Sequence, residues 1–169
     1  MPLAVNQPSD DIRTLSQEWD VLEPLMAGTR VMRAAGTLLL PKWPNEEQDA
    51  YSARLAVATL FPAYQRTVGV MSGKPFAKAL TLSDDTPASI RAWAEDIDLQ
   101  GVNLHAFASQ MFAESFYGLA GILVDYPRME TPPEGRTVAQ VEATGARPYF
   151  VRVMHRQIIG WQAAVERGA

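Results

Sequence analysis

Residue types that commonly perform catalysis are sparse in this sequence. It contains two histidines, His105 and His155, and no cysteine, which excludes thiol nucleophiles, thiolate zinc sites, iron–sulfur clusters and disulfides. Neither histidine has a partner at the spacing of a helical zinc-protease motif. His105 falls on the polar side of an expected helix, and His155 stands beside Arg156 after an expected strand. We therefore interpret His105 as a surface histidine and expect no catalytic role for His155.

Two carboxylates in the middle of the chain are candidate metal ligands. Asp96 and Asp98 carry hard oxygen donors that could ligate Mg²⁺. No phosphate-binding loop accompanies them, and Gly101 follows closely. We therefore expect Asp98 to accept hydrogen bonds from the backbone of a turn that Gly101 closes.

Asp125 is the third candidate, because α/β enzymes often place a catalytic carboxylate at the end of an apolar strand. Here Tyr126 and Pro127 follow, which favours a turn that ends the strand. The glycines form no dinucleotide-binding motif, and Gly73-Lys74 is followed by Pro75 rather than by the helix that a P-loop opens. The residues therefore predict no enzyme and no cofactor.

Length and charge limit the function classes further. The chain has 169 residues and a formal net charge of -4, which suits one domain and argues against a general polyanion binder. Residues 84–125 carry seven acidic side chains against Arg91 alone. We interpret this acidic stretch as a solvated face.

The first eleven residues lack the pattern of a secretory signal, and no apolar run is long enough to span a membrane, so we expect an intracellular protein.

The first 118 residues are expected to be mostly helical. Apolar side chains at helical spacing predict a helix over residues 16–32, with Pro24 in its first turn or at a kink. Residues 41–44 contain two prolines and cannot lie inside a helix. Asn45 and Gln48 have the form of a capping box that opens the next helix, which Pro62 breaks and which resumes up to Gly73.

The last third is expected to add a small sheet. Asn103 caps an amphipathic helix that Gly118 ends. Residues 119–124 predict a buried strand, and residues 147–153 alternate as a second one. Between them we expect an exposed loop over 131–135 and a short helix over 137–143; residues 158–161 suggest a third strand or a turn into one. The fold class is therefore α+β, with the sheet packed on the 103–117 helix.

Seven blocks of sequence, taken in order, resemble the portal (head-to-tail connector) proteins of tailed phages and prophages, in a branch known only as a domain of unknown function. The resemblance covers about residues 30–162. The blocks are residues 39–44 with 51–55, 63–68 with 73–76, 95–101, 107–108, 117–127, 147–149 and 158–161.

This resemblance implies a structural function rather than an enzymatic one. Portal proteins form a ring, typically of twelve subunits, at one capsid vertex; the terminase motor pumps DNA through it and the tail docks onto it. The implied partners are other copies of the chain, capsid and terminase proteins, with DNA only as translocated cargo and no membrane. The implied location is the virion or the host bacterial cytoplasm, and no cofactor is implied.

The family motifs also supply candidate assembly residues. Arg54 matches an arginine that follows a tyrosine in the family, and Arg66-Thr67 match an Arg-Thr pair; both are expected to organise packing between helices or subunits. The full set of structural or assembly candidates is Trp43, Tyr51, Arg54, Tyr64, Arg66, Thr67, Gly73, Asp98, Gly101, Gly118, Gly121, Asp125, Tyr126, Pro127, Arg147, Pro148, Tyr149 and Trp161.

The chain departs from the family in two respects. Family members run to several hundred residues, and where relatives usually carry asparagine before the last tryptophan of the motif this chain has Gly160. We divide it into an N-terminal helical segment, residues 1–35, and a wing-type α+β region, residues 36–169, which we expect to be truncated before the stem, tunnel loop and clip.

The alternative functions are a small non-enzymatic adaptor or protein-binding module and a metal-dependent hydrolase that uses Asp96, Asp98, Asp125 and His105.

Overall fold

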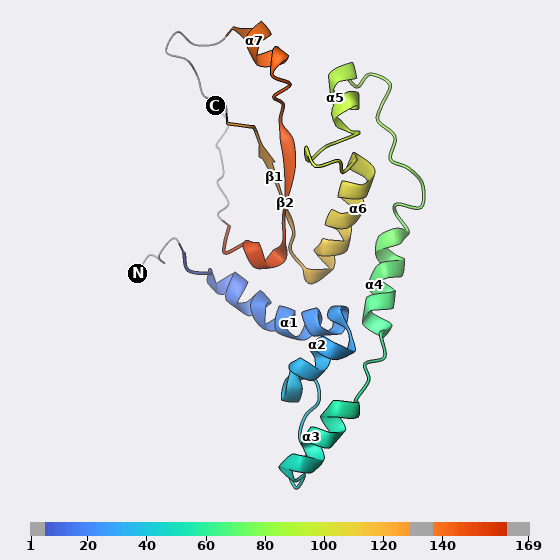
Figure 1. Cartoon of the computed structure of the whole chain (residues 1–169), viewed down its shortest axis with the longest axis vertical. Helices are drawn as coiled ribbons and strands as arrows, with labels where there is room; N and C mark the ends of the chain where they lie inside the picture. The colour runs from blue at the N-terminus through green and yellow to red at the C-terminus, as the bar shows by residue number, and fades with distance from the viewer. Residues whose placement is uncertain (1–5, 129–136, 162–169) are drawn as a thin grey trace, which may run out of the picture.

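The structure is a computed structural model that describes residues 6–128 and 137–161. It is an α+β fold, as predicted, in which helices fill the first two-thirds and a two-stranded sheet lies in the last third. Figure 1 shows an elongated molecule with the sheet toward one end and the helix α3 (Gln48–Val57) at the other. The expected 131–135 loop lies outside the described residues.

The N-terminal helix begins earlier and ends earlier than the 16–32 helix we expected. α1 (Asp10–Ala27) starts at Ser9, whose side-chain oxygen accepts a hydrogen bond from the Ile12 N–H at 3.4 Å. Pro24 lies inside the helix, not in its first turn. Gly28 then separates α1 from α2 (Thr29–Ala34). Its φ of 87° ends the first helix, and glycine adopts this backbone conformation without strain.

The predicted capping box at Asn45 is wrong. The helix α3 starts at Gln48 with Glu47 as its N-cap and no side-chain cap bond. The neighbouring carboxylate of Glu46 instead binds Arg54 through two hydrogen bonds of 2.8 and 2.7 Å and accepts a third from the Trp43 N–H. The fold therefore stabilises this turn by an ion pair rather than by a cap.

The helix expected to run to Pro62 ends earlier, at Val57, whereas the helix expected after Pro62 is confirmed. Between α2 and α3 lies a single 3₁₀ turn, η1 (Gly36–Leu38), and residues 41–44 are not helical, as expected. After Pro62 the helix α4 (Ala63–Gly73) runs to the predicted glycine. A long extended connection then leads to the short helix α5 (Ala88–Trp93).

The cap and end of the amphipathic helix are also confirmed. Asn103 Oδ1 accepts a hydrogen bond from the Ala106 N–H at 2.8 Å and opens α6 (Leu104–Glu114). The helix tightens into the 3₁₀ turn η2 (Ser115–Tyr117), and Gly118 ends it in the left-handed region. The buried side of α6 centres on Phe107, which is 2% exposed.

The sheet has two antiparallel strands, β1 (Gly121–Asp125) and β2 (Tyr149–Val153), with Leu123 opposite Val151. The short helix predicted before β2 is α7 (Val138–Ala143). Phe150 packs against Phe107, which places α6 on the sheet as expected. Residues 158–161 follow the 3₁₀ turn η3 (His155–Gln157) and form no third strand.

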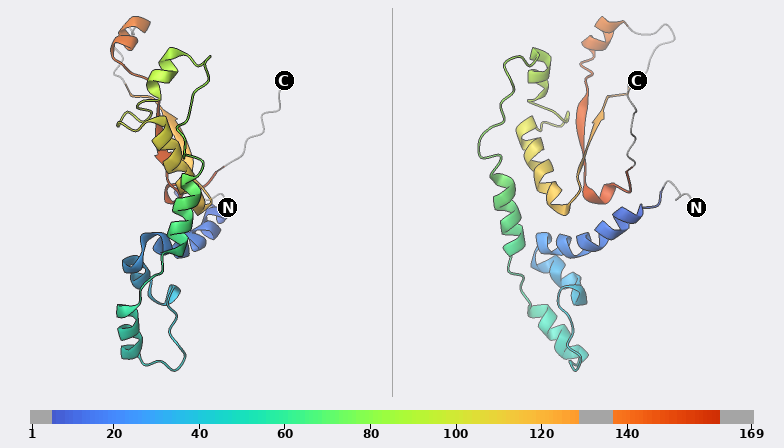
Figure 2. Two further views of the ribbon diagram at one scale, coloured as in Figure 1. Left: turned by 90° about the vertical axis from the view of Figure 1, so that its right-hand side faces the viewer. Right: turned by 180° about the vertical axis from the view of Figure 1, so that it is seen from behind.

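The expectation that β1 is buried is wrong. Ile122, Leu123 and Val124 are 51%, 54% and 60% exposed. Helix α6 packs on the sheet at β2, and β1 lies beyond β2 when viewed from α6, as both Figure 1 and the rear view in Figure 2 show. An apolar run predicts a strand, but it does not determine whether another element covers it.

The described residues contain a small hydrophobic core. Its fully or nearly buried side chains are Ile12, Trp19, Met32, Tyr51, Val68, Ile97 and Phe107. Within the described ranges, no helix combines the length and the apolar character needed to cross a membrane.

Candidate interaction surface

A cluster of polar and charged side chains around the buried His155 joins the two ends of the described chain. His155, 7% exposed, presents Nδ1 to Oε1 of Glu114 at 2.6 Å and Nε2 to Oε1 of Glu23 at 2.8 Å. Arg156 donates from Nε and a terminal nitrogen to the same Glu23 carboxylate and also reaches Asp20 at 2.6 Å. We call these five residues the His155 cluster.

The His155 cluster is enclosed by aromatic rings. Tyr117 stacks on the imidazole with ring centroids 4.0 Å apart, and Trp19 meets it edge-on at 4.9 Å. The Trp19 indole N–H donates to the Tyr117 carbonyl at 2.8 Å. Burial and the nearby Glu114 carboxylate raise the pKa of Tyr117. This packing fixes α1 against η2 and η3.

Sequence reasoning missed this cluster. The position of His155 beside Arg156 in the sequence gives no sign that the imidazole is buried. Its carboxylate partners, Glu114 and Glu23, lie 41 and 132 positions before it in the chain. Hydrogen bonds from Arg156 outweigh the effect of burial and hold the pKa of Glu23 below its usual range. The groups pair with one another, and their position between three elements indicates a structural role.

The turn predicted at Asp98 is confirmed. Asp98 Oδ1 accepts hydrogen bonds from the N–H groups of Gln100 and Val102 at 2.9 and 3.1 Å. Partial burial raises its pKa, but the backbone donors outweigh that effect and the pKa is lowered. Gly101, at a φ of 90°, donates to Asp96, so both carboxylates are used within the turn.

Two further candidate assembly residues, Arg147 and Pro148, attach the sheet to this turn. The Arg147 guanidinium donates to the Asp96 carbonyl and lies 3.5 Å from its carboxylate. Pro148, which precedes β2, supplies a second carbonyl to Arg147 at 3.3 Å. The turn and the start of β2 therefore form one local unit.

The motif residues of the α3 region form a second local unit. Arg54 donates to Glu46 and to the Pro41 carbonyl, and its guanidinium lies 5.4 Å from the centre of the Tyr51 ring. The hydrogen bonds from Arg54, with a further contribution from the Trp43 N–H, hold the pKa of Glu46 at about 2. Arg54 thus organises packing within the chain, while Trp43 itself projects into solvent.

Arg66 and Thr67 behave differently from Arg54. Both are exposed on α4 and line a shallow groove of about 250 Å³ with Val70 and Met71. Among the described residues neither side chain has a hydrogen-bond partner. Tyr64, on the same helix, reaches the Phe116 carbonyl at 3.5 Å near Gly118. Within the chain, Tyr64 therefore links helices, whereas Arg66 and Thr67 do not.

The last group of motif residues surrounds β1. Asp125 accepts from the Tyr126 N–H at 2.8 Å and from the Tyr149 hydroxyl at 3.0 Å, and these bonds lower its pKa. Tyr126 donates from its own hydroxyl to the Ala146 carbonyl, and Gly121 lies against Val153. The turn predicted after β1 is not formed: residues 126–128 have no turn, and Asp125 binds the N–H of the adjacent Tyr126. Trp161, the last motif residue, is 55% exposed.

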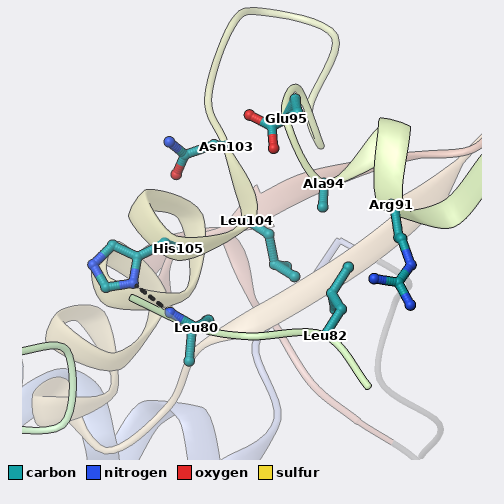
Figure 3. A pocket seen from close by; sticks show the side chains of 8 residues that line it. All are labelled: Leu80, Leu82, Arg91, Ala94, Glu95, Asn103, Leu104 and His105. Carbon is teal, nitrogen blue, oxygen red and sulfur yellow. Dashed lines mark hydrogen bonds between the residues drawn. The ribbon is translucent and has the colours of Figure 1, made fainter. Parts of the chain in front are cut away.

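The best-formed pocket does not combine a base with a nucleophile. It encloses about 310 Å³ beneath the connection between α4 and α5 (Figure 3). Its histidine, His105, accepts the Leu80 N–H through Nδ1 at 3.3 Å, and Arg91 donates to backbone carbonyls of residues 83, 84 and 86. No serine or threonine lines this pocket. In the part of the chain that the structure describes, no three acidic or histidine side chains form a metal site.

Exposed apolar surface is the most distinctive feature of the molecule. The chain exposes 12522 Å², whereas a folded monomer of this mass exposes about 8,200 Å². Counting every residue outside the described ranges as fully exposed still leaves the described residues with roughly 1,700 Å² more than a folded protein of their size. The large exposed apolar side chains include Val57, Phe61, Val70, Ile122, Leu123 and Val124.

The comparisons with known proteins add no relative. No protein-family model and no curated protein matches the chain. The function must therefore be argued from the sequence and the geometry.

Proposed function

We propose that this chain is a non-enzymatic, portal-like structural subunit that works by assembly with other copies of itself. The observation that carries the proposal is the exposed β1. Its apolar side chains Ile122, Leu123 and Val124 project from a sheet that has no third strand in the described residues. Ile122 and Val124 lie on one face of the strand and Leu123 on the other, so β1 exposes apolar side chains on both faces. Exposed apolar surface marks interaction sites.

Large apolar side chains are also exposed on other elements, among them Val57, Phe61 and Val70. Burial of these side chains against other copies would stabilise an assembly. The ordered blocks of portal-like sequence, several of which form local structural units here, favour the ring of a capsid vertex over other assemblies. In that ring the acidic stretch 84–125 would reduce the affinity for the DNA that passes through.

The hydrolase alternative has no support in the geometry. Asp96 and Asp98 bind the turn, Asp125 binds Tyr126 and Tyr149, and His105 binds the α4–α5 connection. These side chains do not converge on a metal position within the described ranges.

Electron microscopy of the purified chain tests the portal proposal. We expect closed rings with a central opening. Particles without rotational symmetry or an opening would contradict the portal proposal. Monomers whose mass stays constant with concentration would favour the adaptor or protein-binding module instead.

A further inference from the structure

We propose that neighbouring copies join head to tail by strand addition, in which residues 77–82 of one copy, here called the arm, pair with the free edge of β1 in the next. This inference rests on the proposed function, because it names the contact through which the subunits assemble.

The arm has the features of a donor strand. It lies in the connection between α4 and α5, where the chain bends at residues 77 and 78 and residues 79–83 have no assigned secondary structure. Residues 78–82 form no backbone–backbone hydrogen bond with any described residue. Its one backbone hydrogen bond to another described residue runs from the Leu80 N–H to the His105 ring. Lys78, Leu80 and Leu82 alternate with Ala79 and Thr81, which is the period of a strand. Its unpaired peptide groups can therefore extend a sheet.

β1 has the features of an acceptor. In the described residues it pairs with β2 alone, so its second edge is open. Natural edge strands are usually protected by lysine, proline or a bulge, and the sequence from Gly121 to Val124 has no charge and no proline. Because a two-stranded sheet is marginally stable by itself, a third strand would stabilise this part of the fold.

The arm and β1 of one chain cannot meet. Figures 1 and 2 show α6 and β2 lying between them in both the front and the rear views. The contact must therefore connect different copies. A contact between two unlike surfaces repeats head to tail, and it closes into a ring when the rotation between copies permits.

Charge complementarity selects an antiparallel register. With Lys78 opposite Asp125, Leu80 falls opposite Leu123 and Leu82 opposite Gly121, all on one face of the sheet. Opposite charges and paired apolar side chains at directly facing positions stabilise a sheet. A parallel arrangement would instead bring Asp84 and Asp85 toward the Asp125 end of β1, where like charges repel.

Cysteine cross-linking tests this register directly, because the chain has no cysteine of its own. Facing Cα atoms of paired strands lie about 4.5–5.5 Å apart, within disulfide range. Leu80 and Leu123 are 45% and 54% exposed, so replacing them should leave the fold intact. After oxidation, the Leu80→Cys/Leu123→Cys variant is expected to give a ladder of species at multiples of 18.6 kDa on a non-reducing gel.

Matched variants separate this contact from other modes of assembly. Leu80→Cys/Ile122→Cys places the second thiol on the opposite face and is expected to give no ladder. Leu123→Cys alone would give dimers if β1 paired with β1, which would overturn the inference. In a second measurement, Lys78→Asp is expected to weaken assembly severalfold because it sets two carboxylates opposite each other, and Lys78→Arg is expected to leave it unchanged.

The failure of this inference can be told from the failure of the proposed function. An assembled mass without a ladder in the Leu80→Cys/Leu123→Cys variant would overturn the arm contact and leave the portal-like subunit in place. A monomeric mass would overturn both.

Discussion

Glu114 and His155 are joined twice, because one carboxylate oxygen lies 2.6 Å from the ring Nδ1 and 3.0 Å from the backbone nitrogen of His155. The second ring nitrogen faces Glu23. Each ring nitrogen therefore lies within hydrogen-bond distance of a carboxylate oxygen. The two ends of the described chain are thus held together by a polar network centred on the buried His155.

Removing the imidazole should destabilise the fold strongly. In His155→Ala two carboxylates lose their common partner, and Trp19 and Tyr117 border a cavity. Because breaking a buried pair costs about 3–5 kcal/mol and Glu23 is partly exposed, we expect a loss of about 2–4 kcal/mol in the free energy of unfolding. Urea denaturation measures it. Arg66→Ala, on exposed α4, is the control and should change stability by less than about 0.5 kcal/mol.

The Glu46–Arg54 pair makes a prediction about pH. The pKa of Glu46 is lowered from 4.5 to about 2. Because the folded pKa lies below the unfolded one, its contribution to stability is fully present above pH 4.5 and is lost as the pH falls toward 2. An NMR titration of the side-chain carboxyl should give a midpoint near 2 in the parent chain. In Arg54→Gln the midpoint should move back toward 4.5; a parent midpoint already near 4.5 would refute the pairing.

Replacing either of two glycines by alanine is expected to change the stability of the fold, in opposite directions. Gly101 has a φ of 90° and Gly69 lies inside α4, and an added Cβ would touch nothing within 4 Å at either position. Gly101→Ala should therefore destabilise by about 1–2 kcal/mol through backbone strain alone. Gly69→Ala should stabilise by about 0.5–1 kcal/mol. Thermal unfolding of both variants checks this, and equal shifts of the same sign would be inconsistent with the described backbone.

The acidic stretch predicts weak DNA binding. Residues 84–125 carry seven acidic groups and one basic group, so few counterions are released when the chain meets phosphates. We expect the dissociation constant for duplex DNA at physiological salt to be weaker than about 10⁻⁴ M. Fluorescence anisotropy with a labelled duplex measures it. Micromolar affinity with a steep salt dependence would argue against a conduit that does not grip DNA.

Local chemistry made much of the fold predictable. Asn103 can cap only the helix that follows it, Gly118 supplies the left-handed conformation that ends the helix, and Asp98 binds a turn within four residues. Each of these features depends on neighbours in the sequence. For the same reason the helical first two-thirds and the two strands could be read from periodicity and glycine positions.

Features that depend on distant partners were not predictable. Asn45 does not cap α3. The turn before this helix is held instead by Glu46, whose partner Arg54 lies beyond the first turn of α3. His155 became buried because Glu23 and Glu114 arrive from separate helices. The exposure of β1 follows from which elements reach the sheet, and an apolar run of six residues carries no information about that.

The central claim is that another copy of the chain covers the exposed apolar strand β1. Sedimentation velocity of the intact chain across a hundredfold range of concentration tests it most directly. The account predicts a species many times larger than 18.6 kDa, and it predicts that Leu123→Lys, which places a charge in the middle of β1, shifts that species to monomer without loss of helical circular dichroism. A parent chain that sediments as a monomer at every concentration would contradict it.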